Sequence, residues 1–485
     1  MRIFRGIFCS ISKYFHAMNS ISTFLNTIIN PADKPRTIWL WSIPIIVLSC
    51  LATVYLGSKI YLAFGLILLC IFAFRWEWFL FYLFLAVEPL TTLIFWNYKT
   101  YINYFILVLI VFFWLARKIL FPGKRFEVSV ELLLYSIVFM AFTLLTSLHG
   151  GLTRDEIEAI IRFLFFFGLV LIIYDIYQPR DTPILMAFAS IPLVIQLYYM
   201  IKEFSNTTSI PELLMLYRLK PTGYFDNING YAGILINILP FWIAVVIWSR
   251  RKWLRMIALA LSLILSAGLL LSNSRAAFAG MILTVFMFFL WSKRLKTFLV
   301  ICMIVLILFM SVPILKVIVS LAFRVEAGTT SRDEIWASTI QMIQKNFWFG
   351  VGIGNYTEEF TPYFPTVGVH NFFKEVSHAH NQILMQTAEM GIWGLLLILT
   401  LYYLPLRAGV KALRITTGSA EQKVLVYGVL GGILATFGRS FFELGMLAEG
   451  SFHPEIYFWT LFAMILKMSQ NRFWDKSIYN NTTIP

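Results

Sequence analysis

The sequence predicts an all-α, polytopic integral membrane protein with about 12 to 14 transmembrane helices. Of its 485 residues, 59% are hydrophobic and only 13% are charged, a balance far more apolar than that of soluble globular proteins. Runs such as SIPIIVLSCLATVYLG, YFILVLIVFFWLA and FLVICMIVLILFMSVPIL carry few or no charges. Several of these runs, with their flanks, are long enough to cross roughly 30 Å of hydrocarbon as helices.

The hydrophobic segments divide the chain into three parts. Residues 1–30 place apolar side chains at helical three-and-four spacing, so we expect an amphipathic helix at the membrane interface. Residues 36–470 form the transmembrane domain, and residues 471–485 form a cytoplasmic tail. The expected spans lie near residues 38–56, 59–74, 77–96, 101–120, 131–148, 157–176, 183–201, 229–248, 254–272, 276–291, 297–317, 381–404, 424–442 and 455–468.

The formal charge of +14 is explained by membrane topology rather than by nucleic-acid binding. The basic residues form short clusters between apolar runs, such as RKILFPGKR, RRKWLR and KRLK, and these clusters recur at alternate connections. The positive-inside rule then places both termini in the cytoplasm of an inner-membrane protein. It leaves two long connections outside, at about 202–228 and about 318–380.

The second outer connection contains a helix signal of its own, SRDEIWASTIQMIQKNFWFG. Ser331 and Glu334 have the spacing of a capping box. One apolar face is expected from Ile335, Thr339, Met342, Ile343 and Phe347. The motif GVGIGN follows it, and because no strand precedes these glycines we expect a tight loop rather than a dinucleotide site. Such a helix would cover a site on the outer surface.

Charged residues close to the hydrocarbon are functional candidates, because their insertion is expensive. Those at the outer ends of spans or in the outer connections are Arg218, Arg275, Arg332, Arg439 and Glu443. Several arginines beside lipid suit a membrane-anchored anion such as a lipid diphosphate. Taken alone, Arg275 is explained as well by contact with phospholipid headgroups, and Arg332 more simply as a solvated residue of the first helical turn.

Polar side chains gather in SHAHNQILMQTAEMGIWG, at the outer mouth of an apolar segment. If a helix starts at about Ser377, one stripe holds His378, Gln382, Gln386, Glu389 and Trp393. His380 falls off this stripe unless it belongs to the turn before the helix. A neutral histidine here could accept a proton from a sugar hydroxyl. Zinc is not expected, because no cysteine or compact third ligand accompanies the two histidines.

Three motifs together resemble the O-antigen ligase and polymerase superfamily of bacterial envelope enzymes. They are SRAAFAG at the start of a span, SRDEIWASTIQMIQKNFWFGVGIGNY, and HAHNQILMQTAEMGIWG. The last one fits the ligase pattern of histidine and asparagine followed by two spaced glycines, as His380, Asn381, Gly391 and Gly394. The resemblance covers roughly residues 220–395, where PTGYFDNINGYAG also looks like a family segment.

The resemblance implies a GT-C-like membrane fold and an inverting, metal-independent glycan transfer without a cofactor. The donor would be a glycan on undecaprenyl diphosphate, and the acceptor a hydroxyl of lipid A core or of another glycan. It assigns His380 as the general base, whereas the helical stripe favours His378. Donor-diphosphate binding falls to Arg275 and Arg332, to which we add Arg218. A supporting polar shell is expected from His378, Asn381, Gln382, Gln386, Glu389 and Arg439.

Two alternatives stay open beside the ligase, which the histidine motif favours. The first is a polymerase of the same superfamily, which shares the outer loop and the arginines. The second, from another class, is a transporter for lipid-linked glycans, which would also need an arginine-lined cavity. Transporters usually place polar residues at broken helices near the membrane midplane, whereas here they gather at one face. No nucleic-acid partner is expected.

Overall fold

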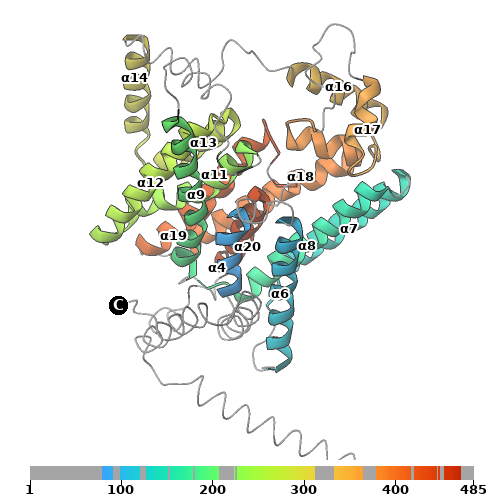
Figure 1. Ribbon diagram of the computed structural model, residues 1–485, viewed down its shortest axis with the longest axis horizontal. Helices are drawn as coiled ribbons and strands as arrows, with labels where there is room; N and C mark the ends of the chain where they lie inside the picture. Colours follow the sequence, from blue (N-terminus) through green and yellow to red (C-terminus); the bar gives the residue numbers. More distant parts are fainter. Residues whose placement is uncertain are drawn as a thin grey trace, which may run out of the picture. The chain divides into compact units, whose positions relative to one another are not determined.

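The part of the chain that the structure describes is helical and contains no strand (Figure 1). It is a computed structural model that describes residues 79–90, 99–120, 127–150, 153–178, 181–206, 223, 225, 227–311, 332–363, 378–416, 420–444, 446–447, 453–470 and 474. The expected amphipathic start, the spans at 38–56 and 59–74, Arg218 and nearly all of the tail lie outside these residues. The chain divides into two units at residue 80, and the described residues from Phe81 onward belong to the larger one.

The described helices overlap the expected spans, although α18 continues to Ile415, well past the expected end at residue 404. They are α4 (Phe79–Val87), η1 (Glu88–Leu90), α6 (Lys99–Leu120), α7 (Val130–Gly150), α8 (Arg154–Ile176), α9 (Thr182–Ser205), α11 (Ile228–Trp248), α12 (Lys252–Ser272), α13 (Arg275–Trp291), α14 (Leu295–Ser311), α18 (Gln382–Ile415), α19 (Ala420–Ser440) and α20 (His453–Met468). Among the described helices, α7, α8, α9, α11, α12 and α18 are long and apolar enough to cross a membrane. The predicted all-α, polytopic membrane fold is confirmed.

One expected span differs from a single helix. In place of a helix over 77–96, α4 ends at Val87 and the short 3-10 helix η1 follows. Pro89 lies within η1, and a proline ring has no backbone N–H and collides with the preceding turn of an α-helix. A helix that reaches this proline therefore ends before it.

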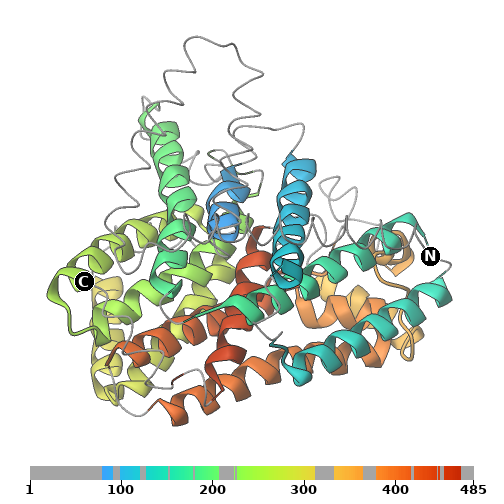
Figure 2. The same cartoon turned by 90° about the horizontal axis from the view of Figure 1, so that it is seen from below.

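Three helices form the buried centre of the larger unit. Nearly every residue of α11 is buried from Ile228 to Val245. The same holds for α19 from Gly428 to Ser440 and for the described side chains of α20. Figures 1 and 2 show α11 beside α12 and α19. A helix that is apolar all round is buried among other helices, which accounts for this position.

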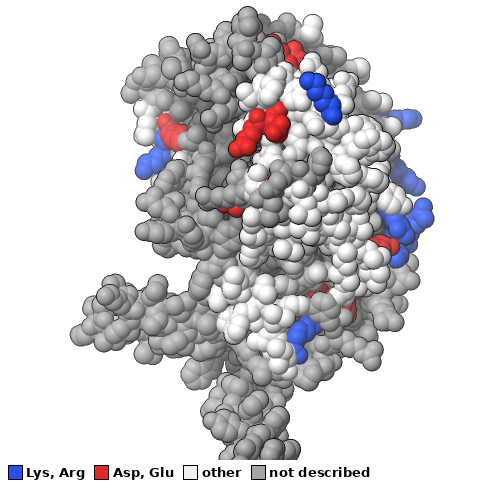
Figure 3. All heavy atoms as spheres, turned by 90° about the vertical axis from the view of Figure 1, so that its right-hand side faces the viewer, with Lys and Arg blue, Asp and Glu red and all other residues white. Residues whose placement is uncertain are grey.

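The helices at the periphery of the protein, such as α12, have one buried stripe and an apolar exposed side. In α12 the buried side chains recur at intervals of three and four: Ala258, Ser262, Leu265, Leu269 and Ser272. On its other side Met256 and Leu263 are 66% and 64% exposed. Figure 3 shows a face on which uncharged described side chains form a broad area with charged ones around it. Apolar exposed faces of this kind suit contact with lipid.

Glycines allow α13 and α19 to pack closely. A Cβ atom added at Gly280 would lie 2.1 Å from the Ala435 carbonyl oxygen, and one added at Gly438 would lie 2.8 Å from the Gly280 Cα atom. Small residues that let helix backbones approach are typical of interfaces inside membranes. This contact brings the first residues of α13 close to the end of α19, where the polar site is found.

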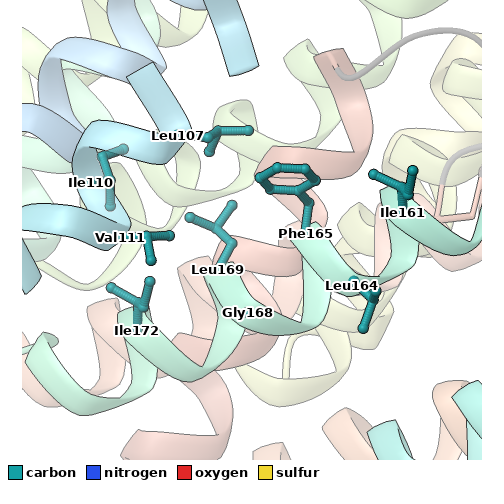
Figure 4. Close-up of a pocket in the computed structure, with 9 residues that line it drawn as sticks. All are labelled: Leu107, Ile110, Val111, Ile161, Leu164, Phe165, Gly168, Leu169 and Ile172. Carbon is teal, nitrogen blue, oxygen red and sulfur yellow. The ribbon is translucent and has the colours of Figure 1, made fainter. Parts of the chain in front are cut away.

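An apolar cavity of about 320 Å³ lies between α6 and α8 (Figure 4). It is lined by Leu107, Ile110, Val111, Ile161, Leu164, Phe165, Gly168, Leu169 and Ile172. None of these side chains can donate or accept a proton, so the chemistry of the protein lies elsewhere.

Replacing Gly280 by alanine should destabilise the protein, because the added methyl group can fit only if α13 and α19 move apart. Overpacking of this kind costs about 1–3 kcal/mol, which should appear as a lower thermal unfolding temperature in detergent. Gly168→Ala is the matched control, because nothing lies within 4 Å of its added Cβ atom. Equal unfolding temperatures for the two variants would contradict the close packing.

Candidate active site

The candidate active site centres on one buried carboxylate and two histidines. His378 and His380 precede α18, and Glu443 follows α19. Glu443 Oε1 lies 3.1 Å from His380 Nδ1 and 3.3 Å from His378 Nε2. The carboxylate side chain is only 7% exposed, whereas the His378 and His380 side chains are 29% and 27% exposed. Both rings are therefore open to a substrate on one side and bonded to the protein on the other.

The two histidines belong to the turn before α18, not to the helix itself. The helix starts at Gln382, because the Asn381 side chain caps it by accepting from the backbone N–H groups of Ile383 and Leu384 at 2.9 and 3.0 Å. His380 has a left-handed backbone with φ 49°. The helix thus starts next to the expected span start at residue 381 and not at about Ser377, so the stripe that assumed the earlier start no longer favours His378.

A helix of the long connection between α14 and α18 holds this turn in place. The predicted loop helix is present as α16 (Arg332–Lys345), which lies beside α17 (Tyr356–Phe360) and the start of α18 (Figure 1). Trp336 Nε1 donates to the Ala379 carbonyl oxygen at 2.9 Å. Ala379, between the two histidines, is fully buried, and so is Met342 of α16. Phe347 is 44% exposed because α16 ends before it, so it does not belong to the apolar face.

Side chains at the start of α18 fix the segment that carries the carboxylate. Asn381 Nδ2 donates to the Phe441 carbonyl oxygen at 3.1 Å. The buried Gln382 side chain donates to the Leu447 carbonyl oxygen at 3.1 Å and accepts from the Met446 and Leu447 N–H groups at 3.3 and 3.4 Å. Asn381 and Gln382, predicted as part of a polar shell, therefore bind the backbone on either side of Glu443 and do not contact its carboxylate through these bonds.

Arg439 supports the same segment from the end of α19. Its guanidinium is buried and donates to the carbonyl oxygens of Leu444 and Asn229. Asn229 Nδ2 in turn lies 3.4 Å from Glu443 Oε2. The charge of Arg439 is close to the carboxylate, but its described hydrogen bonds go to the backbone. Its position suits a supporting residue.

The two arginines predicted to bind a diphosphate lie near each other, and Arg332 is beside the carboxylate. Arg332 Nη2 is 3.6 Å from Glu443 Oε2. Burial lowers the pKa of the Arg332 guanidinium, the Glu443 carboxylate opposes this, and the neighbouring charge of Arg275 adds to the lowering. Arg275 is the first residue of α13, at the end of the helix that packs against α19. In the described part of the chain, the Glu443 carboxylate therefore has the charges of Arg332 and Arg439 close to it, and Arg275 lies near Arg332.

Glu443 is ionised despite its burial. Burial alone would raise the pKa of its carboxyl group, but hydrogen bonds from His378 and His380 and the charge of Arg439 hold that pKa well below its usual range. A carboxylate in this state only accepts hydrogen bonds. The ring nitrogen that each histidine presents to it must therefore carry a proton.

Glu389 and the glycine motif stabilise the helix behind the site. The α18 helix is interrupted at Gly391, which has φ 64°. The GVGIGN motif forms the predicted tight loop after α16, with the Gly352 N–H bonded to the Glu389 carbonyl oxygen at 3.0 Å and the Gly354 N–H bonded to its carboxylate at 2.9 Å. A Cβ atom added at Gly350 would lie 2.3 Å from the Glu389 backbone. Glu389 thus binds the loop from the buried side of α18.

Geometry alone would also allow a metal ion at this site. One ligand atom from each of His378, His380 and Glu443 lies within 4.8 Å of the others. The expectation that no third ligand accompanies the histidines is wrong, because Glu443 lies next to them although it follows His380 by 63 residues. The nearby guanidinium groups of Arg332 and Arg439 repel a cation, so the charge around the site favours an anion.

These features define a class of protein: a polytopic membrane protein with a histidine–carboxylate pair beside several arginines. Residues 260–399 match the family model described as O-antigen ligase. The match includes Arg275, Arg332 and both histidines, and it ends before Glu443. No curated protein matches the chain. The predicted resemblance to the O-antigen ligase and polymerase superfamily is confirmed, and this family implies a glycosyl-transfer enzyme that works in a membrane on a lipid-linked glycan.

Glu443 is the residue whose role the sequence did not reveal. It stood out as an acid in the apolar segment SFFELGML near the end of a span. Nothing in the pattern connected it with the histidines, because the segment and the histidine turn are far apart in the sequence and meet through the packing of α18 and α19.

Gln382→Leu should destabilise the protein more than Gln386→Leu. The first change leaves the Met446 and Leu447 backbone groups without their partner, at about 1–3 kcal/mol. Gln386 lies one turn further along and is also buried, but its side-chain oxygen has no hydrogen-bond partner among the described residues. Thermal unfolding in detergent measures both. A smaller effect for Gln382→Leu would contradict its role as a clamp.

Proposed function

We propose that the protein transfers a glycan from undecaprenyl diphosphate to a sugar hydroxyl of lipid A core on the outer face of the cytoplasmic membrane. The family match supports a transferase of this kind. Near the histidines, guanidinium groups outnumber the single carboxylate of Glu443, which supports an anionic, membrane-anchored donor. The reaction inverts the anomeric carbon and uses no metal. A polymerase that extends another glycan is the alternative within the family, and a transporter for lipid-linked glycans is the alternative outside it.

The proposal rests mainly on which ring nitrogen each histidine turns toward the Glu443 carboxylate. His380 meets it through Nδ1, which must carry the proton, so Nε2 at the far end of the ring is left as a proton acceptor. His378 meets it through Nε2, so its only remaining acceptor is Nδ1, next to its own backbone. His380 is therefore the better general base, in agreement with the family pattern.

In the proposed step, His380 Nε2 accepts the proton of the acceptor hydroxyl while the hydroxyl oxygen bonds to the anomeric carbon of the donor. The bond from that carbon to the diphosphate oxygen breaks, and the electron pair leaves with undecaprenyl diphosphate. Arg275 and Arg332 hold the diphosphate and stabilise the charge that grows on it. Arg218 has the same assignment from sequence. The activated donor makes nucleotide and metal unnecessary.

The side of the membrane that the site faces is inferred from the distribution of lysine and arginine along the sequence. The basic clusters between the spans place both termini in the cytoplasm and the histidine turn outside. There α16 would cover the site from the aqueous side. Gln386 and Glu389, on the buried side of α18, would support the histidine turn from beneath.

His380→Ala should abolish transfer and leave donor binding intact, because the ring acts on the acceptor and not on the diphosphate. His378→Ala should retain a substantial part of the activity. The assay uses purified protein in detergent with a lipid-linked glycan and an acceptor, and it measures release of undecaprenyl diphosphate. Addition of a metal chelator should leave the rate of the native protein unchanged.

Three results would contradict this account. Loss of activity in His378→Ala with full activity in His380→Ala would make His378 the base. Inhibition by the chelator that added metal reverses would show a metal-dependent reaction. No release by the native protein, together with movement of the lipid-linked glycan across vesicle membranes, would identify a transporter.

Arg275→Ala and Arg332→Ala should weaken donor binding, because each removes a charged donor to the diphosphate. Losing a hydrogen bond to a charged group costs about 1.5–3 kcal/mol, or roughly 10- to 100-fold in donor Kd. Arg407→Ala is the control: this arginine pairs with Glu131 on the surface at 3.4 Å, and both side chains are 54% exposed. An unchanged donor Kd in either of the first two variants would remove that arginine from the donor site.

A further inference from the structure

We infer that Glu443 is a positioning residue that sets the proton-accepting state of His380 and keeps it in register with the donor-binding Arg332. The inference deepens the proposed function and rests on it. It concerns a residue outside the stretch that matches the family, which ends at residue 399.

The two oxygens of the carboxylate serve different partners. Oε1 accepts from His380 Nδ1 at 3.1 Å and from His378 Nε2 at 3.3 Å. Oε2 lies 3.6 Å from Arg332 Nη2 and 3.4 Å from Asn229 Nδ2. One buried group therefore contacts both the proposed base and a proposed donor-binding arginine, which come from separate elements of the fold.

The carboxylate selects one tautomer of His380. Because it only accepts hydrogen bonds, a neutral His380 ring that faces it keeps its proton on Nδ1, which leaves Nε2 free to take the proton of the acceptor hydroxyl. When Nε2 takes that proton the ring becomes a cation, and the negative charge of Glu443 stabilises it. Glu443 itself touches no substrate and gains no proton in this step.

The segment that carries Glu443 is held firmly enough for this task. Leu444, the next residue, packs in the same apolar cluster as Ala379 of the histidine turn. The Arg439 guanidinium binds the Leu444 carbonyl oxygen, and Gln382 binds the segment three residues further on. Groups that are fixed before the substrate arrives need no reorganisation during the reaction, which is how a rigid orienting residue contributes to rate.

His378 has a supporting role in this arrangement. It donates to the same oxygen as His380, and the two rings lie edge to face with centroids 4.1 Å apart. Its hydrogen bond goes to Oε1, whereas Arg332 lies beside Oε2. This separates two histidines that look equivalent in the sequence: one accepts the proton, and the other holds the group that orients it.

The direct test is the tautomer of His380 in the resting native protein. Nitrogen NMR of histidine-labelled protein is practical because the chain has only six histidines, and the His380→Ala and His378→Ala variants assign the signals. We expect a neutral His380 ring protonated on Nδ1. A ring protonated on Nε2 would overturn the inference without the need for any Glu443 variant.

Kinetics of Glu443→Gln supply the second test. The variant keeps the shape of the side chain and removes its charge, so kcat should fall on the order of 100-fold or more, while the donor Kd stays the same or decreases. A merely structural role would instead raise the donor Kd or lower the yield of folded protein. Glu359→Gln, a change at an exposed acid of α17, is the control and should match the native protein.

The outcomes separate this inference from the proposed function. If His380→Ala is inactive but Glu443→Gln has native kcat with native donor binding, Glu443 does not position the base and only the inference fails. If His380→Ala is fully active, the proposed base itself is wrong. A Glu443→Asp variant that recovers part of the kcat lost in Glu443→Gln would support the need for a charge at this position.

Discussion

The hydrogen bonds between the Glu443 carboxylate and the two histidines are the interaction on which the rest of the site depends. An ionised carboxylate that is buried without partners costs several kcal/mol, so the fold must bring partners to it. The turn before α18 brings both histidines to the segment after α19, which carries the carboxylate. The starts of α13 and α16 add Arg275 and Arg332 around them. The site is thus assembled where several helices begin or end, not within one helix.

The rigidity of this assembly comes from packing that contains no catalytic group. The α13 and α19 helices approach through Gly280 and Gly438, and Arg439 then leaves α19 to bind the backbone beyond it. On the opposite side, α16 packs on the histidine turn through an apolar cluster and one indole hydrogen bond. The buried helices α11, α19 and α20 support both sides, while the exposed apolar faces of helices such as α12 suit lipid. Precision at the site therefore depends on distant, apolar contacts.

Hydropathy was sufficient to predict the helices, because spans are long and their apolar content is unambiguous; α6 to α9 and α11 to α14 all coincide with expected segments. It was not sufficient for their ends. The Asn381 side chain accepts hydrogen bonds from the first turn of α18, so the helix begins after both histidines. The arginines and histidines were found as candidates because charge beside lipid is conspicuous. Glu443 was a candidate for the same reason, but its contact with the histidines was not predicted, since a contact across 63 residues depends on helix packing that a periodic pattern does not contain.

A structure of the protein bound to an unreactive donor analogue with an intact diphosphate tests the central claim most directly. The account predicts the diphosphate oxygens within hydrogen-bond distance, about 3 Å, of Arg275 and Arg332. It also predicts that the anomeric carbon faces His380 Nε2, with room for an acceptor hydroxyl between them. A diphosphate bound away from both arginines, or an anomeric carbon on the side of the histidines occupied by Glu443, would contradict it.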